Sequence, residues 1–127
     1  MSDTTTRGIR VQVQSFYDEE RSSPPDNYYF FAYQVTISNL GHETAQLVSR
    51  EWIITDGNGE TQQVQGPGVV GEEPVLAPGE AFEYVSFCPL ATPVGSMQGA
   101  YLMVLENGER FEAEIAPFSL AVPHMVN

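Results

Sequence analysis

Residues 66–79 read GPGVVGEEPVLAPG, and the first six letters match the G-x-G-x-x-G pattern of dinucleotide-binding proteins. In those proteins an α-helix follows the glycines, and the free N–H groups at its N-terminus bind the pyrophosphate. Here two prolines and a glycine follow within residues 72–79, which excludes a helix of useful length. The carboxylates of Glu72 and Glu73 would also repel phosphate. The stretch therefore predicts a loop between strands of an all-β protein.

Strand patterns lie on both sides of this loop. From Ile9 to Gln14 apolar and polar residues alternate with the period of two that is typical of a half-buried strand. Similar short runs, bounded by turn residues, recur along the chain. The predicted strands are 9–14, 28–39, 46–55, 61–65, 82–88, 100–106 and 111–115. No segment shows sustained helical periodicity. The sequence thus predicts an immunoglobulin-like or fibronectin type III-like β-sandwich of about seven strands, with a small barrel as the alternative.

Turn residues separate the predicted strands. The run DGNG at 56–59 is predicted to join two strands as a hairpin. Asn107-Gly108 is predicted to close a two-residue hairpin, because this dipeptide suits the turns that such hairpins need. Beyond the last predicted strand, Pro117 and Pro123 predict an irregular tail.

The composition describes one acidic domain. The chain has 127 residues, 42% of them hydrophobic, so we predict a single domain over residues 1–127 with an ordered core over about 9–118. Seventeen acidic residues, five arginines and no lysine give a formal net charge of −12. Such a surface repels nucleic acid and anionic membranes, whereas it suits solubility, basic partners or hard cations. Weak divalent cation binding at the acidic runs 18–20 or 72–73 stays open, and solvated surface charge is the alternative.

Targeting signals are absent from the sequence. No apolar run approaches the roughly 18 residues of a membrane span, and the polar residues 1–8 lack the apolar core of a signal peptide. Cys88 is the only cysteine, so no intrachain disulfide can form, which favours a reducing compartment. We therefore expect a cytoplasmic protein without membrane insertion. Because no His or basic cluster neighbours Cys88, it is predicted to be a buried structural thiol.

No constellation of side chains in the sequence predicts an active site. A G-x-S-x-G elbow is missing, and His42 and His124 lie too far apart in sequence to have the ligand spacing of a zinc site. Residues 56–60 alternate oxygen side chains like the start of a calcium loop. The twelfth position of that loop should be a bidentate Glu, yet here it is Pro67. The sequence therefore predicts no catalytic residue and no dedicated metal site.

One predicted strand is crowded with aromatic residues. Phe31 and Tyr33 have the spacing of core residues. Tyr28 and Phe30 then fall on the opposite face of the sheet. Two interpretations stay open: an exposed aromatic face that serves as a contact surface or dimer interface, or a face covered by the N- or C-terminal segment.

Five stretches together resemble the bacterial ApaG family. They are VQVQSFY (11–17), WIITDGNG (52–59), VQGPGVVGEEPVLAPGEAFEY (64–84), CPLATPVGSMQGAY (88–101) and GERFEAEIAPF (108–118). The resemblance covers roughly residues 9–118. The chain departs from the family pattern at Glu51, where a basic residue or His commonly precedes the tryptophan, and at Phe87, where a glycine often precedes the cysteine.

The resemblance implies a fibronectin-type β-sandwich and no catalytic residue. Bacterial members, also called CorD, are linked with cobalt tolerance and magnesium efflux. In eukaryotes the domain is similar to modules in an F-box protein and a polymerase-interacting protein, where it is a protein–protein interaction unit. The glycine block of the family falls on the loop quoted above. The predicted contact residues are Gly66, Gly68, Val69, Val70, Gly71 and Pro74.

The sequence thus predicts a non-enzymatic binding module that mediates protein–protein interaction, with a further role in divalent cation (cobalt or magnesium) homeostasis. The alternative is nucleotide or pyrophosphate binding at Gly66–Gly71. No cofactor is predicted, the protein partner stays unnamed, and the protein is expected to be a monomer or a homodimer. The backbone of the loop discriminates between these functions. Its N–H groups either converge on one point, as a phosphate requires, or are engaged within the protein.

Overall fold

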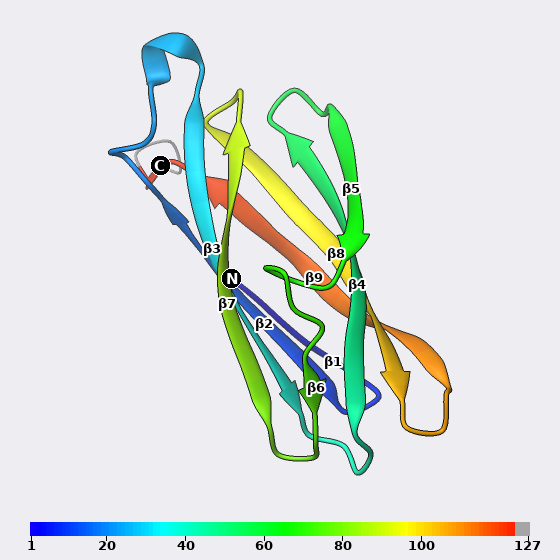
Figure 1. The fold of residues 1–127 in the computed structure, drawn as a ribbon. Helices are drawn as coiled ribbons and strands as arrows, with labels where there is room; N and C mark the ends of the chain where they lie inside the picture. The colour runs from blue at the N-terminus through cyan, green and yellow to red at the C-terminus, as the bar shows by residue number, and fades with distance from the viewer. Residues whose placement is uncertain (124–127) are drawn as a thin grey trace.

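Nine β-strands make up almost all of the regular structure in the computed structural model, which describes residues 1–123 (Figure 1). The strands are β1 (Ser2–Thr6), β2 (Ile9–Tyr17), β3 (Tyr29–Asn39), β4 (Ala45–Asp56), β5 (Thr61–Pro67), β6 (Val75–Leu76), β7 (Ala81–Leu90), β8 (Val94–Leu105) and β9 (Arg110–Ala121). One turn of 3₁₀-helix, Pro24–Asp26, lies between β2 and β3. The all-β prediction is confirmed. The predicted strands correspond to all of these except β1 and β6.

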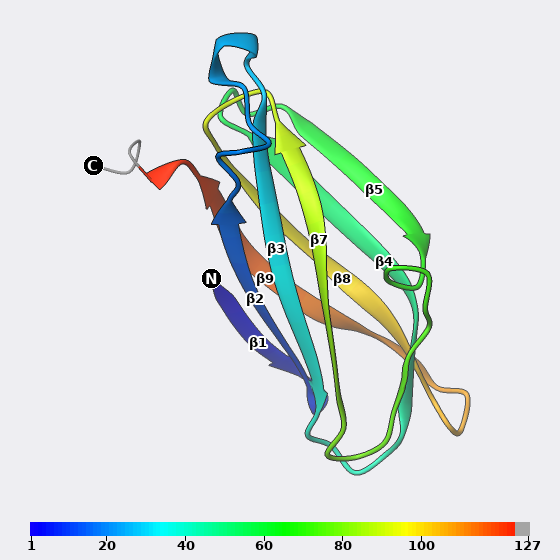
Figure 2. The same cartoon turned by 60° about the vertical axis from the view of Figure 1, so that its left-hand side comes forward.

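Two antiparallel sheets pack face to face as a sandwich (Figures 1 and 2). The first sheet has the order β1-β2-β3-β7, and the second has the order β5-β4-β8-β9 with the short β6 beside β4. In the first sheet Val35 of β3 pairs with Val13 on one side and Tyr84 on the other. Because side chains alternate along each strand, this register points whole rows of apolar residues at the opposite sheet.

Trp52 of β4 lies in the middle of the aromatic part of the core. Its ring centroid is 5.3 Å from that of Tyr33, 5.9 Å from that of Phe118 and 6.3 Å from that of Tyr101. The rings meet edge to face, an arrangement that stabilises aromatic pairs beyond the burial of their area. Phe31 and Tyr33, predicted as core residues, are 1% and 5% exposed.

The last strand is longer than the sequence predicted. β9 continues to Ala121, and Phe118 and Leu120 are buried in the core, so the prediction of an irregular tail from Pro117 was wrong. The register of β9 against β8 shifts at this point, where two residues of β9, Pro117 among them, oppose the single residue Gln98. Proline is accepted at such a bulge because its missing N–H removes no ladder hydrogen bond.

β1 was not predicted, because residues 2–6 were assigned to a polar N-terminal segment. The strand pairs antiparallel with β2 through a two-residue turn, Arg7-Gly8. The φ angles of these two residues are 47° and 85°, and a type I′ hairpin requires both to be positive. The strands therefore extend from Ser2 to Ala121, a wider span than the expected core.

The Asn107-Gly108 hairpin has a three-residue loop rather than the predicted two-residue turn. Gly108 N donates to Leu105 O at 2.9 Å, and Leu105 N donates to Glu109 O at 2.8 Å. Gly108 has a φ of 86°, whereas Asn107 is not in the left-handed region. This is a type I turn completed by a left-handed glycine. The turn at 56–59 has the same form, and the φ of its last glycine is 82°.

The two long sides of the sandwich are closed in different ways. On one side β1 and β2 pack against β9, where Ser15 Oγ donates to Ser119 O at 2.7 Å and Glu114 N donates to Thr6 Oγ1 at 3.1 Å. On the other side the edge strands are β7 and β5. There the chain between β5 and β6 crosses the opening between the sheets (Figure 1). This crossing segment is the loop that the sequence singled out.

Candidate functional site

The chain after β5 folds back on itself as a tight turn. Val69 N donates to Glu72 O at 2.8 Å, and Glu72 N donates to Val69 O at 2.9 Å. The two residues between them, Val70 and Gly71, have φ angles of 44° and 81°, as in a type I′ turn. Gly68 N donates to Val48 O of β4 at 3.0 Å. These three N–H groups are thus engaged within the protein and do not converge on a phosphate site.

Other groups approach two glycines of the block closely, and at Gly68 the approaching group is backbone, which leaves no room for a side chain. Gly68 has a φ of 56°, and a Cβ at this position would lie 2.2 Å from the carbonyl oxygen of Glu72. A Cβ at Gly66 would lie 3.0 Å from both terminal nitrogens of Arg50. Gly66 belongs to β5, so the loop between strands begins one residue after the end of that strand, at Gly68. The glycine at position 68 therefore fixes the backbone shape of this loop.

Arg50 anchors the turn, and it is not among the residues predicted for the site. The residue lies on β4 two positions before Trp52, so its side chain starts from the inner face of the sheet. Its Nη1 donates to Pro67 O at 2.9 Å and to Gly68 O at 3.0 Å. Arg7, Arg10 and Arg21 form ion pairs with carboxylates, whereas Arg50 and Arg110 form none with the residues that the structure describes. The one feature of the sequence that points to this role is a charged residue at an inward-facing position of a predicted strand.

Val69 and Val70, neighbours in the turn, have opposite environments. Val69 is 1% exposed and belongs to the core, whereas Val70 is 55% exposed at the tip. A φ of 44° is unusual for a β-branched residue, because its Cβ and γ carbons crowd the backbone in the left-handed region. The fold thus holds an apolar side chain in solvent at a strained position.

A cavity of about 350 Å³ lies under the turn, at the open side of the sandwich. The turn covers it from one sheet, Tyr84 and Ser86 of β7 face it from the other, and Arg50, Trp52 and Tyr33 complete its wall. The cavity thus lies where segments from both sheets meet, which is a common position for ligand sites.

The hydroxyl groups near this cavity are neutral. The hydroxyls of Tyr84 and Tyr101 share a hydrogen bond, and burial raises the pKa of both residues. Burial also raises the pKa of Tyr33, while Ser86 and the positive charge of Arg50 lower it in part. The guanidinium of Arg50 is therefore the charged group that faces the cavity.

Cys88 is buried, as the sequence predicted. The thiol is 3% exposed, and burial raises its pKa to about 11. A thiol with this pKa is protonated at neutral pH, so it lacks the thiolate that nucleophilic catalysis requires.

The outer face of the first sheet carries the exposed aromatic side chains. Phe16, Tyr28 and Phe87 are 47%, 41% and 48% exposed. The guanidinium of Arg21 lies over two rings of this face, 5.6 Å from the centroid of Phe30 and 5.3 Å from that of Phe87. Of the two predicted alternatives, the exposed aromatic face fits the described residues, although Arg21 shields part of it.

Asp56, the first residue of the calcium-like run, stabilises a local turn. Asp56 Oδ1 accepts hydrogen bonds from Asn58 N at 2.8 Å and Glu60 N at 3.0 Å, which explains the alternating oxygen side chains as a turn. No group of three or more Asp, Glu, His or Cys residues within 1–123 is placed to hold a metal ion. His124, which lies too far from His42 in sequence to suggest a zinc site, is outside the residues that the structure describes.

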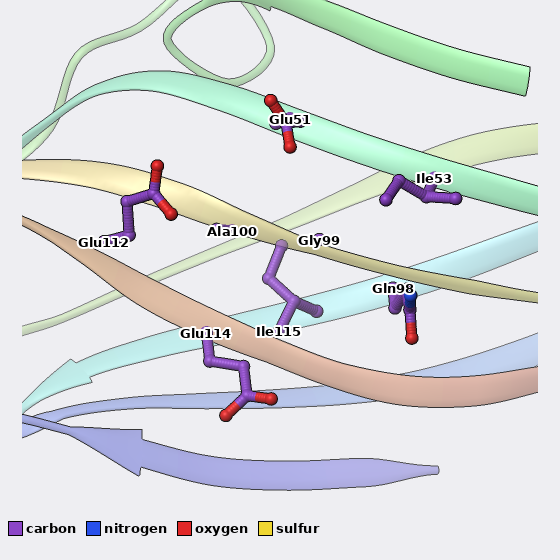
Figure 3. A pocket seen from close by; sticks show the side chains of 8 residues that line it. All are labelled: Glu51, Ile53, Gln98, Gly99, Ala100, Glu112, Glu114 and Ile115. Atoms are coloured by element: carbon purple, nitrogen blue, oxygen red, sulfur yellow. The ribbon is translucent and has the colours of Figure 1, made fainter.

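A second depression lies on the outer face of the other sheet (Figure 3). Glu51, Glu112 and Glu114 surround a floor formed by Gly99 and Ala100. Gln65 Nε2 donates to Glu51 Oε2 at 2.7 Å. These glutamates account for part of the negative surface that the composition predicted.

The geometry defines a class: a fibronectin-like sandwich of two antiparallel sheets whose open side is covered by an arginine-anchored glycine turn. The ApaG domain family matches residues 19–105. Protein ApaG of Methylobacterium sp. (strain 4-46) is 54% identical over 125 residues, which cover 98% of this chain and 96% of that protein. Protein ApaG of Anaeromyxobacter sp. (strain K) is 54% identical over 127 residues and the full length of both chains. The chain belongs to the ApaG family, as the resemblance predicted.

A solved structure gives the same result. The crystal structure of the putative ApaA protein from Bordetella pertussis is similar with a TM-score of 0.89 and 54% sequence identity, covering 91% of this chain and 94% of that one. Because the two chains share both sequence and structure at this level, the fold of this chain is that of its family. Among residues 1–123 there is also no helix with the length and apolar character that crossing a membrane would take.

Proposed function

We propose that this ApaG-family protein is a non-enzymatic protein-interaction module and that the turn from Gly66 to Pro74 is its contact site. The strained, exposed Val70 is the observation that carries the proposal. A non-glycine residue held in the left-handed region costs on the order of 1 kcal/mol or more, and such strain persists where the surrounding structure enforces it and often marks a functional site. An apolar side chain presented in this way suits insertion into a pocket of a partner.

The hydrogen bonds of the turn support the proposal because they restrict the motion of its tip. The paired hydrogen bonds between Val69 and Glu72, the bond from Gly68 to β4 and the two bonds from Arg50 tie the turn to the sandwich. A contact residue on such a support loses little conformational freedom on binding, which favours affinity.

A substitution that separates binding from folding tests this proposal. In Val70→Asn the asparagine accepts the left-handed conformation, so we expect the free energy of unfolding to stay the same or to rise by up to about 1 kcal/mol. Burial of a valine side chain in a partner contributes about 1.5 kcal/mol or more. We therefore expect the variant to retain a partner from cell lysate at least about tenfold less well, by quantitative mass spectrometry of the captured proteins.

Val75→Asn is the matched control, because Val75 is 57% exposed on β6 and receives the same chemical change away from the tip. Proteins captured equally by the wild type and Val75→Asn, and lost with Val70→Asn, would support the turn as the contact site. A captured set that is the same for all three proteins would contradict it.

Two further parts of the proposal come from the family and from composition. A role in cobalt or magnesium homeostasis is supported by the family resemblance and the acidic composition, and a route through a partner protein is consistent with the lack of a metal-ligand cluster among residues 1–123. Cytoplasmic location is supported by the single, buried cysteine.

A further inference from the structure

Arg50 has donors that the protein does not use. A guanidinium carries five N–H donors, and Nη1 makes both of the hydrogen bonds that hold the turn. Nε and Nη2 donate to none of the residues that the structure describes, and the cavity under the turn is lined by this same side chain. Neither nitrogen is fully buried, so both are accessible to solvent or to a ligand in the cavity, and the side chain lacks a counter-charge among the described residues.

Charge is distributed in a way that makes this cation unusual. The chain has 17 acidic residues and a net charge of −12, yet Arg50 has no carboxylate partner among the described residues. Arg7, Arg10 and Arg21 each have one, whereas Arg110 also has none among these residues but is exposed to solvent. Unpaired half-buried charges are expensive to keep unless a ligand completes them. An anion from outside the chain would therefore supply the counter-charge that Arg50 lacks among the described residues.

The chemistry of the walls narrows the class of anion. Trp52, Tyr33 and Val69 form the apolar part of the wall, with only 1% to 5% of each residue exposed, and Ser86 adds a polar group at the β7 side. A guanidinium edge matches the two oxygens of a carboxylate. A phosphate dianion would need further donors, but the nearby N–H groups of Gly68, Val69 and Glu72 are engaged in the turn.

We propose that the cavity binds a small monocarboxylate with an apolar body, whose carboxylate pairs with Arg50. The volume of about 350 Å³ is at the small end of the range for ligand cavities, so one ring or a short branched chain fills it. The carboxylate that pairs with Arg50 belongs either to a free acid or to the C-terminus of a peptide. The proposal goes beyond the proposed function, because it concerns the cavity under the turn and not the exposed side chain at its tip.

Trp52 gives a direct readout, since it is the sole tryptophan and lines the cavity. Benzoate is titrated against the protein with benzamide as its neutral counterpart, and both fluorescence and backbone amide shifts are recorded. We expect saturable binding of benzoate with a dissociation constant below about 1 mM, and binding of benzamide at least about tenfold weaker. N-acetylphenylalanine and its amide form a second pair. If the acid of this pair binds more tightly than benzoate, the source is a peptide C-terminus; if not, it is a free acid.

Two variants and one control complete the test. Arg50→Lys keeps the positive charge but loses the two parallel N–H donors of the guanidinium. Ser86→Val narrows the cavity while leaving Arg50 and the turn in place. Each is expected to weaken benzoate binding at least about tenfold. Val85→Ser, on the outer face of the same strand, should leave binding unchanged. The proposal is overturned by equal binding of benzoate and benzamide, by tighter binding of inorganic phosphate than of benzoate, by unchanged binding in Ser86→Val, or by no saturable shift up to about 10 mM.

Discussion

Gly68→Ala is expected to lower the free energy of unfolding by about 3 kcal/mol or more. Gly68 has a φ of 56°, and the new Cβ would lie 2.2 Å from the carbonyl oxygen of Glu72. That neighbour is backbone held in the turn, so it cannot turn aside as a flexible side chain can. Relief requires the turn to open, which would expose Val69 from the core and release the carbonyls that Arg50 holds.

Gly71→Ala provides the matched comparison, because it makes the same chemical change three residues away in the same turn. Gly71 has a φ of 81°, but a Cβ there would meet nothing within 4 Å. Only the conformational cost remains, about 1 kcal/mol. Urea unfolding of the two variants, followed by the fluorescence of Trp52, measures both. Equal losses in the two variants would mean that the close approach at Gly68 contributes nothing.

Phe118→Ala is expected to destabilise the protein by about 3–5 kcal/mol. Phe118 is 3% exposed, and its ring packs against those of Trp52 and Tyr33 with centroids 5.9 Å and 6.0 Å away. Removing it leaves a cavity beside the rings of Trp52 and Tyr33. The same measurement of urea unfolding applies, with the midpoint and slope fitted together.

Phe87→Ala is the control for this variant. Phe87 is 48% exposed on the outer face of β7 and contacts the guanidinium of Arg21. Its removal should cost no more than about 1 kcal/mol. A loss for Phe118→Ala as small as that for Phe87→Ala would show that the strand does not continue into the core beyond Pro117.

Most strands of the sandwich could be predicted because their side chains alternate in hydrophobicity. Residues such as Val35 and Ile37 meet the core from a strand whose other face is polar, and that pattern survives in the sequence. The fold class followed from the number and spacing of these strands. The resemblance to the ApaG family then agreed with it.

Segments whose position depends on backbone pairing could not be predicted. The sequence of β1, SDTTT, has no apolar residue, so its place beside β2 comes from ladder hydrogen bonds, the Arg7-Gly8 turn and the ion pair between Asp3 and Arg10. β9 passes Pro117 because a bulge opposite Gln98 accepts a residue without an N–H. Neither the pairing partner of β1 nor the bulge is visible from local composition.

The candidate site was predicted in part. The glycine block was correctly assigned to a strand connection, since no helix could follow it, although its first two residues lie in β5. The anchoring role of Arg50 depends on a contact with residues 17 and 18 positions further along the chain, which no local pattern encodes. A charged residue two positions before the buried Trp52 was the one available sign.

Amide hydrogen exchange at Val69 and Glu72 tests most directly whether the glycine block forms a fixed turn. Each of these N–H groups donates to the carbonyl of the other residue, at 2.8 Å and 2.9 Å. The turn is anchored to the sandwich through Arg50 and Gly68, so both amides should exchange far more slowly than in an unstructured peptide, by a factor of about 100 or more. Exchange of both amides at the rate of an unstructured peptide would contradict the fixed turn and, with it, Val70 as a rigidly presented contact.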